Sequence, residues 1–287
     1  MSDDGRHAIV VIALLGNPFS PSYARARRRG IASADPLAFS SMNVALYTRG
    51  ASAWTLLERT VLPGARSASG MQIGQSTIQW VGDRLEIDID ERTTPLRFPL
   101  RGRVTLRPEI LTATEITLDP LEEHRWWPVA PLARIEVDFA KPGVRFSGHG
   151  YHDANAGSVP LEATFSRWSW SRARAHGRAY VTYDVRTPAG ERSLAVAIGG
   201  DGRLDPMQGS STWSTSLGRT RWQIERRARV DVWQKASVVR SLEDGPFYAR
   251  ALVDTTLGGR PVIAMHETLD AERLKRRWVR HFTRYRM

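Results

Sequence analysis

Short stretches of alternating apolar and polar residues, separated by turn sequences, are the feature that most restricts how this chain folds. Residues 78–80 and 85–89 alternate on either side of Gly82-Asp83, which is typical of a β-hairpin closed by a tight turn. Similar pairs flank Pro142-Gly143 and Pro188-Ala189-Gly190. Further alternating stretches cover residues 135–139, 144–146, 180–185, 194–198, 222–232, 236–242, 248–254 and 262–267. This pattern predicts an all-β protein built from sandwiches or barrels.

Residues 270–285 are the exception, because their apolar positions recur at helical spacing. Asp270 is a suitable N-cap, and arginine and lysine crowd the other positions. The predicted apolar face consists of Leu274, Trp278, Phe282 and Tyr285. The segment is therefore expected to be a basic amphipathic helix, packed on the β-structure or lying on a membrane surface.

The length of 287 residues fits one large domain or two of ordinary size. The turn at Lys141-Pro142-Gly143 divides the chain almost evenly. We therefore predict two domains, residues 1–140 and 141–287, the second ending in the helix.

Charge and composition narrow the classes of function. The net charge of +11 comes mostly from arginine; it suits an anionic surface, and an ordinary solvated basic surface is the alternative. No nucleic-acid-binding motif accompanies it, so no nucleic-acid partner is expected. The absence of cysteine excludes disulfides and thiolate chemistry. No apolar run approaches the ~20 residues of a membrane span, which predicts a soluble or peripheral protein.

Two segments combine acid/base groups with aromatic rings. Residues two apart on a strand share a face, so His124 is expected beside Trp126, and Tyr151 beside Asp153. Ordinary hydrogen-bonded pairs within the structure are the plainer alternative. A metal site built from His149, His152 and Asp153 is disfavoured, because His152 would point away from the other two side chains.

Many segments in the same order resemble the acyclic carotenoid 1,2-hydratases, also called hydroxyneurosporene synthases. The first matches are Asp3-Asp4-Gly5-Arg6-His7, Phe19-Ser20-Pro21, Tyr23-Ala24, Ala26-Arg27-Arg28-Arg29-Gly30 and Asn43-Val44-Ala45-Leu46-Tyr47. The others are His124-Arg125-Trp126, Pro128, Ala130-Pro131, Gly148 to Gly157, Pro160-Leu161-Glu162, Trp168 to Ala173, Leu242-Glu243-Asp244 and Pro246 to Arg250. No single match is specific, but the ordered set covers almost the whole chain.

The resemblance implies a cofactor-independent lyase that hydrates the terminal double bond of an acyclic carotene in the carotenoid biosynthesis of photosynthetic bacteria. It implies two lipocalin-like antiparallel β-barrels, with no metal or cofactor. The family's proposed functional residues match His124, Trp126, Tyr151 and Asp153. We expect a cytoplasmic protein in peripheral contact with the anionic inner (photosynthetic) membrane. A lipocalin-like carrier that binds a polyene unchanged is the non-enzymatic alternative.

The chemistry of this reaction suggests roles for the four residues. Protonating an isolated alkene needs a strong acid, and Asp153 is the expected one, because a carboxyl group among apolar groups has a raised pKa. Trp126 and Tyr151 would stabilise the carbocation. His124 would orient the water or accept its proton, and the roles of Asp153 and His124 are interchangeable at this stage.

The chain departs from the family pattern at its beginning. Family members carry an aromatic strand before the Asp3-Asp4-Gly5 turn, whereas this chain starts at that turn. Residues 8–15 are therefore expected to lack a hairpin partner and to present an unpaired edge.

Overall fold

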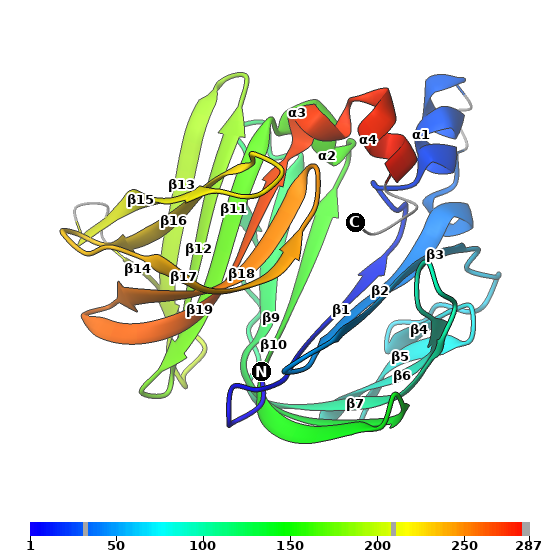
Figure 1. Cartoon of the computed structure of the whole chain (residues 1–287), viewed down its shortest axis with the longest axis horizontal. Helices are drawn as coiled ribbons and strands as arrows, with labels where there is room; N and C mark the ends of the chain where they lie inside the picture. The colour runs from blue at the N-terminus through cyan, green and yellow to red at the C-terminus, as the bar shows by residue number, and fades with distance from the viewer. Residues whose placement is uncertain (31–33, 208–210, 283–287) are drawn as a thin grey trace. The chain divides into compact units, whose positions relative to one another are not determined.

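A computed structural model describes residues 1–30, 34–207 and 211–282 of the chain. Most of the described residues form strands, so the predicted all-β class is confirmed. The predicted lipocalin-like type of fold is also confirmed. The strands gather in four antiparallel sheets (Figure 1). Within the described residues, no helix is both long enough and apolar enough to cross a bilayer.

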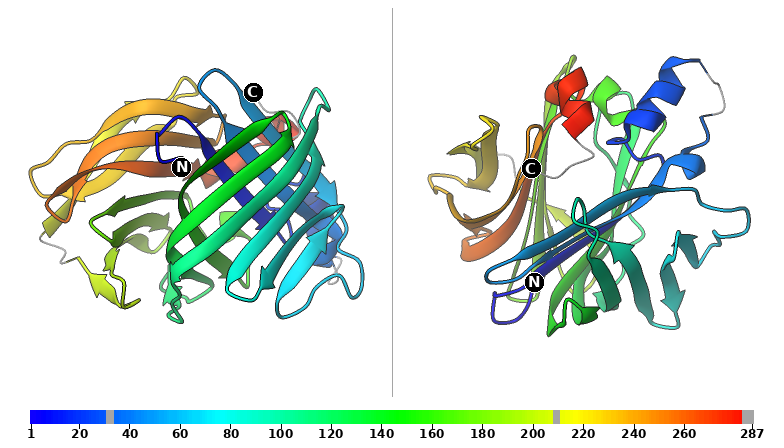
Figure 2. Two further views of the ribbon diagram at one scale, coloured as in Figure 1. Left: turned by 90° about the horizontal axis from the view of Figure 1, so that it is seen from below. Right: turned by 45° about the vertical axis from the view of Figure 1, so that its right-hand side comes forward.

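A three-stranded sheet, a seven-stranded sheet and a helix come first along the chain. The small sheet has the order β1-β2-β3, from β1 (Ala8–Leu14), β2 (Ser40–Tyr47) and β3 (Ser52–Arg59); helix α1 (Pro21–Arg28) and the 3₁₀ helix η1 (Pro36–Phe39) lie between β1 and β2. The larger sheet has the order β10-β9-β7-β6-β5-β4, and its strands lie side by side from green to cyan in Figure 2 (left). Its members are β4 (Gly70–Ile73), β5 (Ser76–Val81), β6 (Arg84–Arg92), β7 (Pro99–Ile110), β9 (His124–Lys141) and β10 (Val144–Gly157), with β8 (Ile116–Thr117) paired to β9.

A second seven-stranded sheet and a short two-stranded one follow. The large one has the order β14-β13-β12-β11-β19-β18-β17. Its strands are β11 (Arg167–Ala175), β12 (Arg178–Thr187), β13 (Gly190–Ile198), β14 (Leu204–Pro206), β17 (Ser237–Asp244), β18 (Tyr248–Leu257) and β19 (Arg260–Asp270). The small sheet pairs β15 (Thr212–Arg219) with β16 (Glu225–Asp231), and three short helices are α2 (Leu161–Thr164), α3 (Ala271–Leu274) and α4 (Arg277–Phe282).

The predicted hairpins are confirmed. Gly82 joins β5 to β6 with a φ of 60°, a conformation that glycine adopts without steric strain. The Pro142-Gly143 turn joins β9 to β10, and residues 188–189 join β12 to β13. The predicted closed barrels are not found, because within the described residues neither large sheet returns to its first strand. Both end in a very short strand, β4 or β14, which offers few backbone groups for closure.

The single C-terminal helix predicted over residues 270–285 is wrong. Two short helices, α3 and α4, are separated by Lys275 and Arg276. Asp270 does cap α3, its side chain accepting from the Arg273 backbone N–H. The buried residues are Leu274 and Val279, and residues five apart lie about 140° around one continuous helix. The break between α3 and α4 lets each short helix turn its own buried residue inward; Tyr285 and the Phe282 side chain are outside the described part.

Two compact units divide the chain, and each consists of separate segments. Of the described residues, the first contains 1–30, 34–108, 133–150 and 280–282, and the second contains 109–132, 151–207 and 211–279. The division at residue 140 stays a prediction. In the first unit, β1 pairs with β2 from Ala8 to Leu14 and stands at the end of its sheet order, which agrees with the expected edge position. All four predicted site residues belong to the second unit.

Candidate functional site

Three of the four predicted residues meet around one carboxylate oxygen. Trp126 lies on β9, and Tyr151 and Asp153 lie two apart on β10, so the latter share a face as predicted. The Trp126 indole N–H donates to Asp153 Oδ2 at 2.9 Å, and the Tyr151 hydroxyl donates to the same oxygen at 2.9 Å. The indole nitrogen is also 3.2 Å from the Tyr151 hydroxyl oxygen. Trp126 is fully buried, while Tyr151 and Asp153 are partly buried.

The electrostatics of this cluster favour the acid form of the carboxyl. Burial raises the pKa of Asp153 to about 6, although the hydrogen bonds from Trp126 and Tyr151 oppose the shift and the charge of Glu267 adds to it. Burial, followed by the neighbouring Asp153 charge, raises the pKa of Tyr151 well above 10, so its hydroxyl remains a donor. Because both donors use Oδ2, the proton of the acid form belongs on Oδ1. Asp153 thus combines a fixed orientation with a proton available near neutrality.

Aromatic rings surround the cluster. The Tyr183 ring meets the Trp126 ring edge-on with centroids 5.5 Å apart, and the Trp170 and Tyr151 rings are 5.6 Å apart. Trp168 is 6.2 Å from Tyr183. Trp168 and Trp170 are two apart on β11, so both side chains are on the same side of the sheet. These rings belong to or pack against one apolar cluster of the second unit, and their electron-rich faces suit a cation.

His124 lies two residues before Trp126 on β9, but its side chain contacts Phe165 and Asp119 instead of Asp153. Its ring packs on Phe165 with centroids 4.6 Å apart, and Nδ1 is 3.5 Å from Asp119 Oδ2. That oxygen accepts from the His124 backbone N–H at 2.8 Å. The Asp119 side chain and the Val159 backbone interact with the ring nitrogens, although neither contact within the described residues has ideal hydrogen-bond geometry. Burial lowers the pKa of His124, with Asp119 opposing the shift, so the imidazole is neutral at pH 7.

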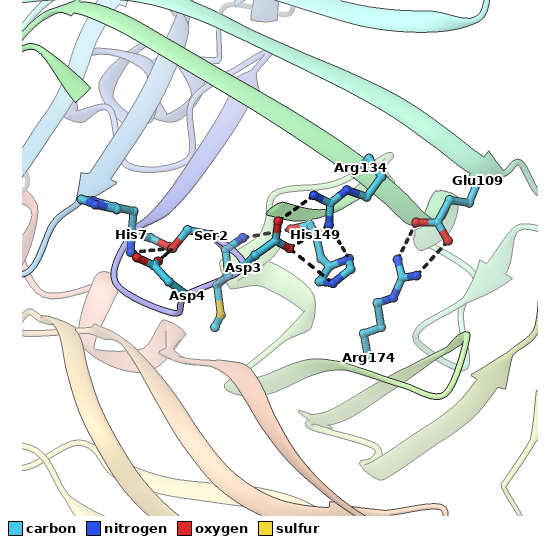
Figure 3. A network of polar contacts seen from close by, with 9 residues as sticks. Ser2, Asp3, Asp4, His7, Glu109, Arg134, His149 and Arg174 are labelled. Carbon is cyan, nitrogen blue, oxygen red and sulfur yellow. Dashed lines mark hydrogen bonds and ion pairs between the residues drawn. The ribbon is translucent and has the colours of Figure 1, made fainter. Parts of the chain in front are cut away.

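The disfavoured metal set does not assemble. His149 belongs to the first unit, where its Nδ1 is 3.3 Å from Arg134 and its Nε2 is 3.6 Å from Asp3 (Figure 3). His152 belongs to the second unit, and burial lowers its pKa to about 4. In the part of the chain that the structure describes, no three His, Asp or Glu side chains are grouped to hold a metal ion.

Sequence reasoning missed several polar neighbours of the site. The Arg250 guanidinium is 2% exposed and lies between Glu267 Oε1, at 2.8 Å, and Glu243 Oε2, at 3.3 Å. Tyr183 was part of a predicted strand without a role, and its hydroxyl donates to Asn155 Oδ1 at 3.3 Å. The available signal was a charged residue inside an apolar strand, as Arg250 is within Tyr-Ala-Arg-Ala-Leu-Val.

The family model that matches this chain is carotenoid hydratase CrtC, over residues 11–287. The chain belongs to the carotenoid hydratase family. It is 42% identical over 277 residues to the acyclic carotenoid 1,2-hydratase of Thiocapsa roseopersicina, covering 95% of this chain and 67% of that protein. The Cereibacter sphaeroides enzyme of the same name is 35% identical, covering 92% of each chain.

Among solved structures, the fold is similar to CghA with Sch210972. The TM-score is 0.58 at 12% sequence identity, and the match covers 94% of this chain and 86% of that one. At this identity the similarity concerns the fold alone. The family assignment therefore rests on the sequence matches, and the lipocalin-like architecture is shared with proteins of distant sequence.

Proposed function

We propose that this member of the hydratase family is a hydro-lyase that adds water across the terminal C1=C2 bond of acyclic carotenes such as neurosporene or lycopene. The observation that carries the proposal is the Asp153 carboxyl, with a pKa near 6, held by Trp126 and Tyr151 among aromatic rings. An alkene without activating groups reacts with water only after protonation, and this site places an acid beside groups that stabilise a cation.

The reaction is balanced by one proton that is given and recovered. Asp153 transfers the Oδ1 proton to C2, the two π electrons form the new C–H bond, and a tertiary cation remains at C1. Water attacks C1, and its surplus proton returns to the Asp153 carboxylate directly or through His124. The ring face of Trp126 stabilises the cation by about 2 kcal/mol in a dry site, and Tyr151 contributes less because the Arg172 guanidinium already lies over its ring.

His124 is suited to handle the water. It is neutral, and its ring nitrogens interact with the Asp119 side chain and the Val159 backbone without ideal hydrogen-bond geometry. With a proton on Nδ1, the nitrogen next to Asp119, Nε2 can accept from water. This argument assigns the acid role to Asp153 and the base role to His124.

Product analysis tests the activity. Lycopene or neurosporene is supplied in membranes without added cofactors, and extracts are analysed by mass spectrometry. We expect a product heavier by one water. Tight binding with unchanged mass would instead support the lipocalin-like carrier, and an isomer of unchanged mass would support another polyene-handling enzyme on this scaffold.

Gly157 provides a test of His124. An added Cβ at Gly157 would lie 2.7 Å from His124 Cδ2 and 2.9 Å from Nε2, so Gly157→Ala must push the imidazole aside. We expect roughly 100-fold slower hydration, because displacing a reacting group by about 1 Å has an effect of this size. Rate assays check the effect, and the His124 imidazole NMR signals check the displacement.

Gly200 is the matched control for Gly157. A Cβ there meets no atom within 4 Å, so Gly200→Ala should hydrate at the normal rate. An unchanged rate in Gly157→Ala, with shifted His124 signals, would contradict a catalytic role for His124.

Membrane contact belongs to the same proposal, because the substrate is a long hydrocarbon dissolved in lipid. In the second unit, Lys275, Arg276 and Arg277 are exposed, and Trp278 is 43% exposed. Cations beside an exposed indole are typical of surfaces that rest on anionic lipid. The first unit has a separate patch on and after α1, formed by Arg25, Arg28 and Arg29.

Charge reversal tests the surface around α4. Each cation near an anionic membrane contributes about 1 kcal/mol, so Arg276→Glu with Arg277→Glu should weaken binding to anionic liposomes by roughly 30-fold or more in a sedimentation assay. The control carries Arg49→Glu with Lys141→Glu, two exposed positions of the first unit and the same change in charge. Equal binding by both variants would eliminate this surface as the docking element and leave the α1 patch.

A further inference from the structure

One row of side chains crosses the large sheet of the second unit. Strand pairing places Glu243 opposite Arg250, Arg250 opposite Glu267, Glu267 opposite Trp170, and Trp170 opposite Tyr183. Residues directly opposite one another in antiparallel strands point to the same side of the sheet. The row is therefore continuous from a buried ion cluster at Glu243 to an aromatic ring at Tyr183.

The aromatic end of this row forms part of the wall around the acid. The Trp170 ring contacts Tyr151, and the Tyr183 ring contacts Trp126. Tyr151 and Trp126 are the two residues that donate to Asp153. Glu267 is thus the first charged residue beside this wall, directly opposite Trp170 on the neighbouring strand.

Arg250 fixes the carboxylate of Glu267. The Arg250 Nε is 2.8 Å from Glu267 Oε1, and the guanidinium lies over the Tyr248 ring at 5.4 Å. The same guanidinium also pairs with Glu243. Two carboxylates and one guanidinium have a formal sum of −1, and Glu267 is the member of this group whose charge acts on Asp153.

We propose that Glu267 is a positioning residue of the hydratase: its fixed negative charge favours the acid form of Asp153 and a carbocation formed beside the aromatic wall. The expected effect on hydration rests on the proposed function, whereas the position of Glu267 rests on the strand pairing. A carboxylate next to an aromatic wall can act on the site through its charge alone, because electrostatic stabilisation does not require contact with the reacting carbon.

The other groups that face Asp153 do not supply this effect. Tyr151 and Tyr183 stay neutral, because burial raises both pKa values well above 10. From β11, the Arg172 guanidinium lies over the Tyr151 ring, with Cζ 5.5 Å from the ring centroid. Its charge is positive, so it cannot raise the pKa of Asp153. Glu267 is the group whose charge raises the pKa of Asp153, and the Glu267 charge likewise raises that of Tyr183.

The experiment follows the titration of Asp153 through Trp126. The Trp126 indole N–H donates to Asp153, so its ¹H–¹⁵N signal in protein labelled at tryptophan reports when that carboxyl loses its proton; Trp126→Phe assigns the signal. Glu267→Gln removes the charge while keeping an acceptor for Arg250. Through an effective dielectric constant near 20, a charge beyond direct contact shifts the pKa of a neighbouring group by a unit or less once a paired cation partly offsets it. We therefore expect the midpoint to fall, by at most about one unit.

Two variants make the result specific. Glu243→Gln removes a carboxylate from the same Arg250 at the distant end of the row and should leave the midpoint near its original value. Glu267→Asp keeps the charge and should restore the original midpoint. An unchanged midpoint in Glu267→Gln, or an equal fall in Glu243→Gln, would overturn the proposal.

Hydration rates separate this inference from the proposed function. The pH above which hydration declines should fall together with the NMR midpoint in Glu267→Gln. If the wild-type protein yields no hydrated product but the midpoint still falls, the electrostatic role of Glu267 stands and the hydratase assignment fails. If the wild-type protein hydrates carotene and neither quantity changes in Glu267→Gln, only the role of Glu267 fails.

Discussion

Asp153→Asn is expected to lower the hydration rate by about 10²- to 10⁴-fold, the usual contribution of a positioned general acid. Asparagine keeps the size of the side chain, and its carbonyl oxygen still accepts from Trp126 and Tyr151. It cannot give a proton to C2. The measurement is the initial rate of water addition, and a rate near that of the wild-type protein would eliminate Asp153 as the acid.

The pH dependence of the wild-type protein belongs to the same prediction. The active form carries the proton, so hydration should decline as pH rises through the Asp153 pKa of about 6. A pKa raised by folding also means that Asp153 contributes stability below its unfolded value of 3.8, and that this contribution is lost as pH rises through 6. Asp153→Asn should therefore be at least as stable as the wild-type protein at pH 8, which shows that lost activity is not lost folding.

Arg250→Met is expected to cause the largest loss of stability, about 3–5 kcal/mol of the free energy of unfolding. The substitution leaves Glu243 and Glu267 facing each other with 14% and 13% of their side chains exposed. Two carboxylates without their shared cation repel each other and have lost much of their hydration. Denaturant titration measures the change, and the melting temperature should fall by roughly 10 °C.

The control for Arg250→Met removes all three charges together. Arg250→Met with Glu243→Gln and Glu267→Gln should regain most of the stability, because a buried ion cluster replaced as a whole carries little net penalty. If the triple variant is no more stable than Arg250→Met alone, packing around the guanidinium, and not charge, accounts for the loss.

Much of the fold was predictable because strand periodicity and turn chemistry are local. The Gly82 turn follows from residues within a few positions of it, and so does the pairing of Tyr151 with Asp153 on one face. The C-terminal helix was predicted wrongly because the burial of Val279 depends on tertiary packing, and that packing breaks the helix after Leu274. Barrel closure was also not local, because it depends on which strands end each sheet.

The site was predictable in part for the same reason. Spacing predicted which residues share a face of β9 and of β10, and the resemblance selected the four residues. Neither could show that Trp126 on one strand donates to Asp153 on the other, because that contact depends on the register between β9 and β10. The roles of Glu267 and Arg250 could not be predicted from the sequence, because the order of the strands in the sheet brings them into one row with Trp170.

The row from Glu243 to Tyr183 also has a consequence for inheritance. Loss of Arg250 alone leaves two carboxylates without their cation, whereas an amide at position 243 or 267 can still accept from Arg250. Single changes that remove Arg250 are therefore expected to be purged, while combined replacements by apolar residues survive. The codons for positions 243, 250 and 267 should thus change together rather than singly, and lineages that lose all three charges should acquire a different way of raising the pKa of Asp153.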